Sequence, residues 1–177
     1  AYAEFADADD YDKSFSLVEE FDNVLITRTF SKAYSLAGLR LGWGYGSKTI
    51  INMIKKIRPP FNVSSGSIAA GIAALEDDDH LHKVVSHNSN IKEWFIEELN
   101  NLGFNAYKTQ ANFVFVIIPE YKNQNAKKIN DYLLSKGIAL RYLSTYGLDN
   151  ALRITLGTKE ELNKTLELLE EFKKKNE

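Results

Sequence analysis

A lysine and an arginine lie at the short connection between two strand-like apolar runs, and this placement of charge restricts the chain more than any other feature. Residues 23–30 (NVLITRTF) are β-branched and apolar over the length of a strand, and residues 39–46 (LRLGWGYG) are predicted to form the next strand. Residues 31–38 (SKAYSLAG) form a loop or a single turn that carries Lys32, and Arg40 follows on the second strand. A charged side chain between two buried strands loses hydration unless it finds a partner or changes its chemistry.

Lys32 is the candidate nucleophile of this loop. Imine formation with an aldehyde requires a neutral amine, and desolvation of a lysine favours that form. Ser31 adds a hydroxyl and a backbone N–H, and Arg40 adds a planar guanidinium that suits a phosphate group. Together these residues indicate a site for a phosphorylated aldehyde. The alternative is structural: Lys32 extends into solvent from a surface loop, and Arg40 pairs with an acidic side chain.

The remaining sequence alternates between helical and strand-like patterns, which predicts an α/β fold. The predicted helices lie at residues 15–21, between Ser47 and Pro59, at 64–75, around 84–102, at 126–136 and after the capping box of Thr158 and Glu161. The other predicted strands are residues 1–5, 112–118, 138–143 and 151–156. The pattern becomes a compact α+β arrangement after the long helix. A boundary inside that helix therefore divides the chain into residues 1–85 and 86–177.

Composition excludes several kinds of partner and site. The chain has 177 residues and a net charge of −2, so it lacks the positive field that gathers nucleic acid or anionic lipid. It has no cysteine, hence no disulfide or thiolate, and no apolar run long enough to span a bilayer. His80, His82 and His87 are expected to be solvated residues at the start of a helix, so no metal site is predicted. We expect a cytoplasmic protein that binds a small molecule.

Three segments resemble one known family. TFSKAYSLAGLRLGWG (residues 29–44) resembles the lysine motif of the fold type I aminotransferases that use pyridoxal 5'-phosphate (PLP), and most of all the histidinol-phosphate aminotransferases. AYAEF (residues 1–5) resembles that family's Asp-Glu-Ala-Tyr strand end, and ALRITLGT (residues 151–158) resembles its substrate-binding arginine strand. The resemblance covers essentially the whole chain. It implies the C-terminal part of a PLP-transferase large domain, with a mostly parallel sheet and helices, followed by a small α+β domain.

The resemblance assigns the cofactor site to four residues. Lys32 matches the catalytic lysine that forms a Schiff base with PLP. Ser31 and Arg40 match the ligands of the cofactor phosphate, and Tyr2 matches the tyrosine that hydrogen-bonds the phenolic oxygen of the cofactor. For Tyr2 the alternative is a buried aromatic residue of a strand.

Two further arginines match substrate-binding positions of the family. Arg153 matches the arginine that receives the carboxylate of the amino or oxo acid, where a bidentate guanidinium gives affinity and orientation. Arg141 is a weaker match to a second anion-binding arginine of the histidinol-phosphate group. The alternatives are an ion pair on the sheet face for Arg153 and a solvated strand end for Arg141.

The family pattern also contains parts that this chain lacks. The aspartate that keeps the pyridine nitrogen protonated would lie two residues before Ala1, and the upstream phosphate loop, ring-stacking aromatic and asparagine are missing. We therefore expect the C-terminal half of a longer protein, which exposes apolar surface where the other half packs. Intact, it would be a homodimer that transfers an amino group between an amino acid or amino-alcohol phosphate and a 2-oxo acid, in amino-acid and specifically histidine biosynthesis. The alternatives are a related PLP-dependent decarboxylase or lyase, and a non-catalytic fragment.

Overall fold

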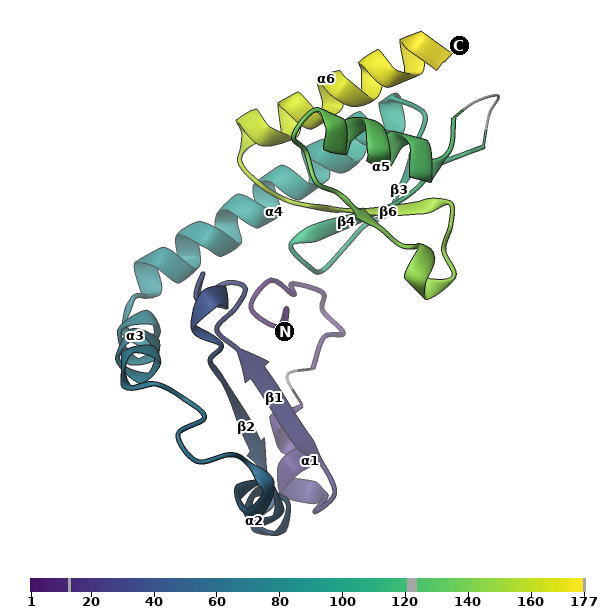
Figure 1. Ribbon diagram of the computed structural model, residues 1–177. Coiled ribbons are helices and arrows are strands. Elements are labelled where there is room, and N and C mark those ends of the chain that lie inside the picture. The colour runs from purple at the N-terminus through teal and green to yellow at the C-terminus, as the bar shows by residue number, and fades with distance from the viewer. Residues whose placement is uncertain (13, 121–123, 177) are drawn as a thin grey trace. The chain divides into compact units, whose positions relative to one another are not determined.

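The computed structural model describes residues 1–12, 14–120 and 124–176 (Figure 1). The contacts between residues divide the chain into two compact units, Ala1–Ser86 and His87–Glu177. The division falls inside the long helix α4 (Asp78–Asn101). That the two units correspond to the large and small domains predicted at residues 1–85 and 86–177 stays a prediction.

The first unit combines helices with one two-stranded ladder. Its elements are α1 (Phe15–Glu20), β1 (Leu25–Thr29), the 3-10 turn η1 (Ala37–Leu39), β2 (Gly42–Gly46), α2 (Lys48–Ile57), α3 (Ser65–Glu76) and the first part of α4. β1 and β2 pair antiparallel, from Leu25 opposite Gly46 to Thr29 opposite Gly42. The chain reverses here because Phe30 N–H donates to the Leu41 carbonyl across the connection, at 3.1 Å. The α/β class is confirmed, and the two strands described in the first unit pair antiparallel.

Residues 1–5 were predicted to end a strand, and they form a turn instead. Phe5 N–H donates to the Tyr2 carbonyl at 3.0 Å, and the side chains of Ala3 and Phe5 are buried. The alternating apolar residues of this segment therefore belong to a turn with two buried side chains. A pattern of only five residues does not distinguish such a turn from a strand.

The helices predicted between Ser47 and Pro59 and at residues 64–75 are confirmed as α2 and α3. Ser47 caps α2, since its Oγ accepts from Ile50 N–H at 3.4 Å, and Pro59 and Pro60 follow the end of the helix. The small residues of α3 allow a close approach, because a Cβ added at Gly71 would lie 2.3 Å from Leu41 Cδ2. The connection between β1 and β2 is thereby packed against α3.

The second unit packs three helices on one face of a four-stranded antiparallel sheet (Figure 1). The strands are β3 (Asn105–Ala106), β4 (Phe113–Ile117), β5 (Arg141–Tyr142) and β6 (Ala151–Thr155), in the order β3-β4-β6-β5. The helices are α4, α5 (Ala126–Ser135) and α6 (Lys159–Asn176), with a 3-10 turn η2 (Ser144–Tyr146) after β5. Phe95 and Leu99 of α4 pack in one core with alternate strand residues such as Val114 and Ile154. This α+β arrangement is the predicted one.

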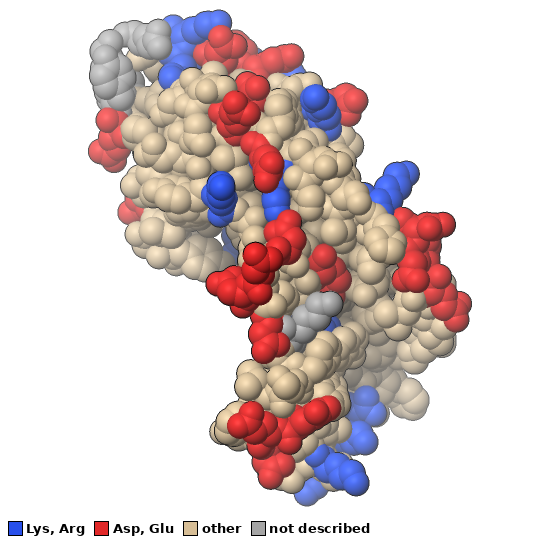
Figure 2. Space-filling model, turned by 180° about the vertical axis from the view of Figure 1, so that it is seen from behind, with Lys and Arg blue, Asp and Glu red and all other residues tan. Residues whose placement is uncertain are grey.

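The capping box at the start of α6 is confirmed. Thr158 N–H donates to Glu161 Oε2 at 2.8 Å, and Glu161 N–H donates to Thr158 Oγ1 at 3.3 Å. In the described ranges, no helix has both the length and the apolar character needed to span a bilayer. On the face shown in Figure 2, acidic and basic side chains are interspersed among larger uncharged areas, which agrees with the small net charge.

Candidate functional site

The connection that carries Lys32, residues 30–41, is closed by backbone hydrogen bonds at both ends; we call it the lysine loop. Phe30 N–H donates to the Leu41 carbonyl at 3.1 Å, and Leu36 N–H donates to the Phe30 carbonyl at 2.9 Å. Inside the loop, Ser35 N–H donates to the Lys32 carbonyl at 2.9 Å. Lys32 therefore begins a closed turn and does not lie in a freely extended surface loop.

The Lys32 amine lies beside an aromatic ring from the start of the chain. Its Nζ is 5.7 Å from the ring centroid of Tyr2, which is a cation–π distance. Both side chains are half-buried, and Ala33 next to the lysine is fully buried. The fold thus brings together two residues, 30 positions apart, that the sequence assigned to one site.

The Ser31 hydroxyl is hydrogen-bonded to Thr29, a strand residue that was not among the predicted site residues. Thr29 Oγ1 donates to Ser31 Oγ at 2.8 Å and accepts from Ser31 N–H at 3.0 Å. The Ser31 N–H is therefore occupied, while the hydroxyl proton of Ser31 remains able to donate to an anion. The sequence could have indicated this contact, because a threonine hydroxyl commonly accepts a hydrogen bond from the backbone N–H two residues later.

Arg40 was expected on the second strand, and the structure places it before that strand. It follows η1 in the left-handed conformation, with φ 53°, which a strand residue does not adopt. Its exposed guanidinium donates from Nη1 to the Ala37 carbonyl at 2.7 Å, and no other hydrogen bond is described for it. Most of its donors are available to a ligand. That Ser31, Lys32 and Arg40 converge on one cavity stays a prediction.

The phenol of Tyr34, in the lysine loop, is harder to ionise than a free tyrosine. Its partial burial raises the pKa of the phenol above the usual value, and the negative charges of Glu4 and Asp78 raise it further. Its ring also packs at 5.0 Å from the ring of Phe30. The phenol therefore stays neutral, and the Tyr34 side chain contributes to the packing of the loop.

Arg141 and Arg153 face each other across two strands of the second unit. They are direct partners in the antiparallel ladder of β5 and β6. Like charges opposite each other destabilise a sheet, and an unpaired guanidinium nitrogen is costly to bury. In the described part of the chain neither arginine has a carboxylate partner, and the buried Nε of Arg153 has no hydrogen bond at all. Among the described residues, the ion pair considered for Arg153 is therefore absent.

Aromatic side chains surround the two arginines. The guanidinium of Arg153 lies 4.8 Å from the ring centroid of Phe113, and Phe115 is its partner on β4. Arg141 donates from Nη2 to the Tyr146 hydroxyl at 2.7 Å. Because strand side chains alternate, Arg153 points away from the helices that cover Ile154 and Leu152. We call this side of the sheet the arginine face.

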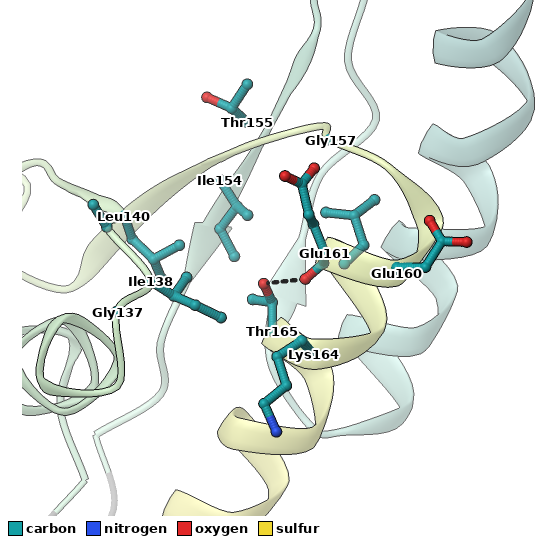
Figure 3. A pocket seen from close by; sticks show the side chains of 12 residues that line it. Gly137, Ile138, Leu140, Ile154, Thr155, Gly157, Glu160, Glu161, Lys164 and Thr165 are labelled. Atoms are coloured by element: carbon teal, nitrogen blue, oxygen red, sulfur yellow. Dashed lines mark hydrogen bonds between the residues drawn. The ribbon is translucent and has the colours of Figure 1, made fainter.

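A cavity of about 570 Å³ lies on the helical side of the second unit (Figure 3). The turn before β5, the end of β6 and the first turns of α6 form it, and Ile138, Ile154 and Leu162 give it an apolar lining. It contains none of the residues assigned to the site, because Arg141 and Arg153 lie on the other face of the sheet. The predicted site residues therefore lie outside this cavity.

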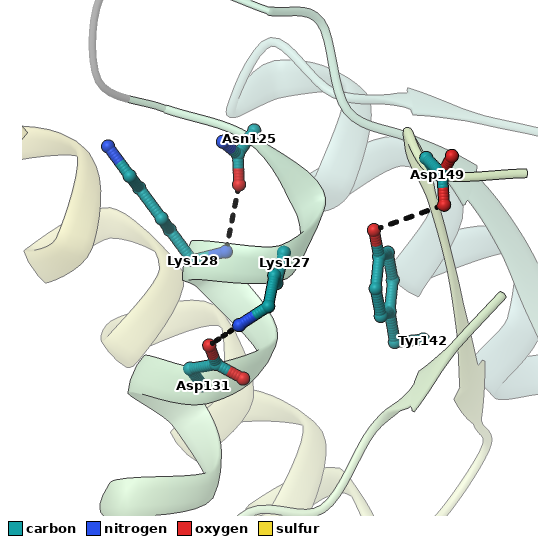
Figure 4. Close-up of polar contacts among 6 residues, drawn as sticks. All are labelled: Asn125, Lys127, Lys128, Asp131, Tyr142 and Asp149. Atoms are coloured by element: carbon teal, nitrogen blue, oxygen red, sulfur yellow. Dashed lines mark hydrogen bonds and ion pairs between the residues drawn. The ribbon is translucent and has the colours of Figure 1, made fainter. Parts of the chain in front are cut away.

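Polar contacts around α5 also lack the features of a reactive site (Figure 4). Lys127 and Asp131 form an exposed ion pair of 2.7 Å at spacing i,i+4, whose hydrogen bond lowers the pKa of the Asp131 carboxyl. Tyr142 donates to Asp149 at a long 3.5 Å. These contacts secure the surface of the helix and the loop after β5.

The histidines form no metal centre in the part of the chain that the structure describes, which holds no cluster of three potential ligands. His80 and His82 lie in the first turns of α4, as expected, whereas His87 lies farther along the helix. His87 Nε2 bonds the Gly157 carbonyl at 2.9 Å, and His80 Nε2 bonds Ser35 Oγ of the lysine loop at 3.1 Å.

Comparison with known proteins identifies the family of the chain. The model of the family aminotransferase class I and II matches residues 1–169. The histidinol-phosphate aminotransferase of Maricaulis maris is 41% identical over 174 residues, which are 98% of this chain and 48% of that protein. The chain spans about half the length of the curated relatives it matches.

Solved structures share the fold. The histidinol-phosphate aminotransferase of Sinorhizobium meliloti, solved in complex with pyridoxal-5'-phosphate, has a TM-score of 0.88 at 32% identity and matches 99% of this chain with 47% of its own. The L-threonine-O-3-phosphate decarboxylase of Porphyromonas gingivalis has a TM-score of 0.83 over 98% of this chain and 53% of its own, but its 22% identity shows the fold alone. The chain belongs to the aminotransferase class I and II family.

Proposed function

We propose that the chain supplies the lysine-bearing and substrate-binding half of a PLP-dependent aminotransferase of the histidinol-phosphate type. The observation that carries this proposal is the half-buried Lys32 amine, held in a closed turn beside the ring of Tyr2. The complete enzyme transfers an amino group between an amino acid or amino-alcohol phosphate and a 2-oxo acid. It is a homodimer, as is usual in the family.

The residues of the lysine loop fit a phosphorylated aldehyde. Lys32 would hold the cofactor through its aldehyde group, while the Ser31 hydroxyl and the available N–H groups of Arg40 would hold its phosphate. Tyr2 would donate a hydrogen bond from its phenol to the ring oxygen of the cofactor. PLP, when bound, supplies the ring that accepts electrons from the substrate Cα. With substrate on the cofactor, the Lys32 amine would be free to take up and return the proton of the substrate Cα as general base and acid.

The arginine face fits the substrate side of this reaction. An anion between Arg141 and Arg153 would relieve the like-charge contact across β5 and β6 and give Arg153 Nε a partner. We assign the substrate carboxylate to Arg153 and a second anionic group to Arg141. The rings of Phe113 and Phe115 provide an apolar wall beside the carboxylate.

The test is covalent capture of PLP. The chain is mixed with PLP, reduced with borohydride and digested, and the modified peptide is identified by mass spectrometry. We expect an absorbance band in the visible range before reduction and the modification on Lys32. Capture on several exposed lysines without preference for Lys32 would contradict the proposal. Assay of the complete enzyme then separates amino transfer from release of CO₂, which marks the alternative decarboxylase.

The exposed apolar side chains of the first unit support a further, complementary half. Ile57 is 82% exposed and Phe61 is 100% exposed, and no residue of α2 is buried. No residue of β2 is buried either, so the ladder of β1 and β2 leaves surface for a further layer. Since the curated relatives are about twice as long as the matched region, we assign this layer to the half they possess beyond it.

We therefore expect the chain alone to bind an apolar dye and to self-associate in sedimentation. Replacing Ile57 with asparagine should reduce both effects, because it removes an exposed apolar side chain of α2. Leu134→Asn is the matched control, as Leu134 is 57% exposed on α5 of the second unit. A stable monomer that binds no dye would show that the first unit needs no further layer.

A further inference from the structure

One side-chain contact joins the start of α4 to the lysine loop. His80 Nε2 and Ser35 Oγ are 3.1 Å apart, although 45 positions separate the two residues. Both belong to the first unit. Ser35 is three residues from Lys32, so the contact reaches the loop close to the reactive amine.

Ser35 holds a conformation that needs support. Its φ is 59°, in the left-handed region that a serine adopts only at a cost. In this conformation its N–H donates to the Lys32 carbonyl at 2.9 Å and closes the turn that begins with the lysine. A change at Ser35 therefore alters the backbone that carries the amine.

His80 is itself fixed where α3 meets α4. Its N–H donates to Asp77 Oδ1 at 2.9 Å, which anchors the backbone beneath the imidazole. A second contact holds the other end of the loop, since Ser67 Oγ of α3 donates to the Leu39 carbonyl at 3.0 Å. Two described side-chain hydrogen bonds thus join the loop to the helices, and the one from His80 lies nearer to Lys32.

We propose that His80 is a positioning residue for Lys32, which acts by holding Ser35 in its left-handed conformation. The inference rests on the proposed function only in treating Lys32 as the lysine that captures PLP. His80 does not touch the amine. It fixes the turn from which the Lys32 side chain extends toward Tyr2, and so limits the directions in which the amine can lie.

The test compares four variants of the full chain by two measurements. His80→Ala and Ser35→Ala remove the hydrogen bond from either side, His80→Gln restores a polar group at similar reach, and His82→Ala is the control. His82 is an exposed histidine two residues farther along the same helix, and no side-chain hydrogen bond is described for it. The measurements are amide hydrogen exchange at Ser35 and the PLP concentration that gives half-maximal borohydride capture on Lys32.

We expect His80→Ala and Ser35→Ala to speed exchange at Ser35 and to raise the half-maximal PLP concentration about two- to tenfold, the range for one lost hydrogen bond. His80→Gln should recover most of both changes, and His82→Ala should change neither. Unchanged exchange in both alanine variants, with circular dichroism showing an intact fold, would overturn the proposal, as would altered exchange with unaltered capture. If no variant captures PLP on Lys32 while exchange still depends on His80, the proposed function fails and the hold on the loop stands.

Discussion

Replacing Lys32 with alanine is expected to abolish capture of PLP and to lower the kcat of the complete enzyme by at least about 10²- to 10⁴-fold, the usual loss of a general acid–base group. The reason is that no other described lysine lies in the closed turn beside Tyr2. The measurements are the visible absorbance band and the mass of the reduced adduct for the chain, and initial rates for the enzyme.

Lys32→Arg separates charge from nucleophilicity. The guanidinium keeps the positive charge near the Tyr2 ring but does not form an imine under these conditions. We expect it to fold normally and to capture no PLP. The control is Lys48→Ala, an exposed lysine at the start of α2, which should behave as the unchanged chain. Full capture in Lys32→Ala would remove Lys32 from the reaction and return it to the structural alternative.

The helices and the longer strands could be predicted from sequence because their signals are local. The cap at Ser47, the Pro59–Pro60 stop and the Thr158–Glu161 capping box each act within one turn of helix. The core of the second unit also follows from periodicity, since the buried residues of α4 and α6 recur at helical spacing.

The short elements could not be predicted in the same way. β3 has two residues and shows no alternation, and β5 forms only over Arg141–Tyr142 although the apolar pattern extends over residues 138–143. Their limits are set by which residues of the neighbouring strand offer partners. The left-handed turn at Arg40 is likewise imposed by closure of the lysine loop, which a sequence window around Arg40 does not contain.

The residues of the candidate site also fall into those with a local sequence signal and those without one. Lys32, Ser31 and Arg40 were found from one contiguous motif, and Tyr2 from its resemblance to a second. Thr29 and His80 were missed. The bond between His80 and Ser35 depends on how α4 meets the lysine loop, and the histidine stands in a polar stretch that indicates only solvation. Tertiary contacts of this kind leave no local pattern.

Arg153→Ala should raise the KM of the complete enzyme for the amino or oxo acid and leave PLP capture at Lys32 intact. The expected penalty is roughly 2 to 5 kcal/mol, by analogy with truncation of one partner of a buried charge pair. The effect should fall on KM because the guanidinium lies on the arginine face and its free Nε calls for an external anion. Arg153→Lys should recover part of the affinity, since a lysine keeps the charge and loses the bidentate geometry.

Stability distinguishes this role from a structural one. Arg153 has no carboxylate partner among the described residues and faces Arg141 across the ladder, so its removal relieves a like-charge contact. We expect the urea midpoint of Arg153→Ala to stay unchanged or rise, apart from the loss of its contact with Phe113. Arg141→Ala is the graded comparison, with a smaller rise in KM for substrates that carry a second anionic group. Unchanged KM together with a large fall in the midpoint would make Arg153 a structural residue, and the assignment of an anionic substrate to this face would then fail.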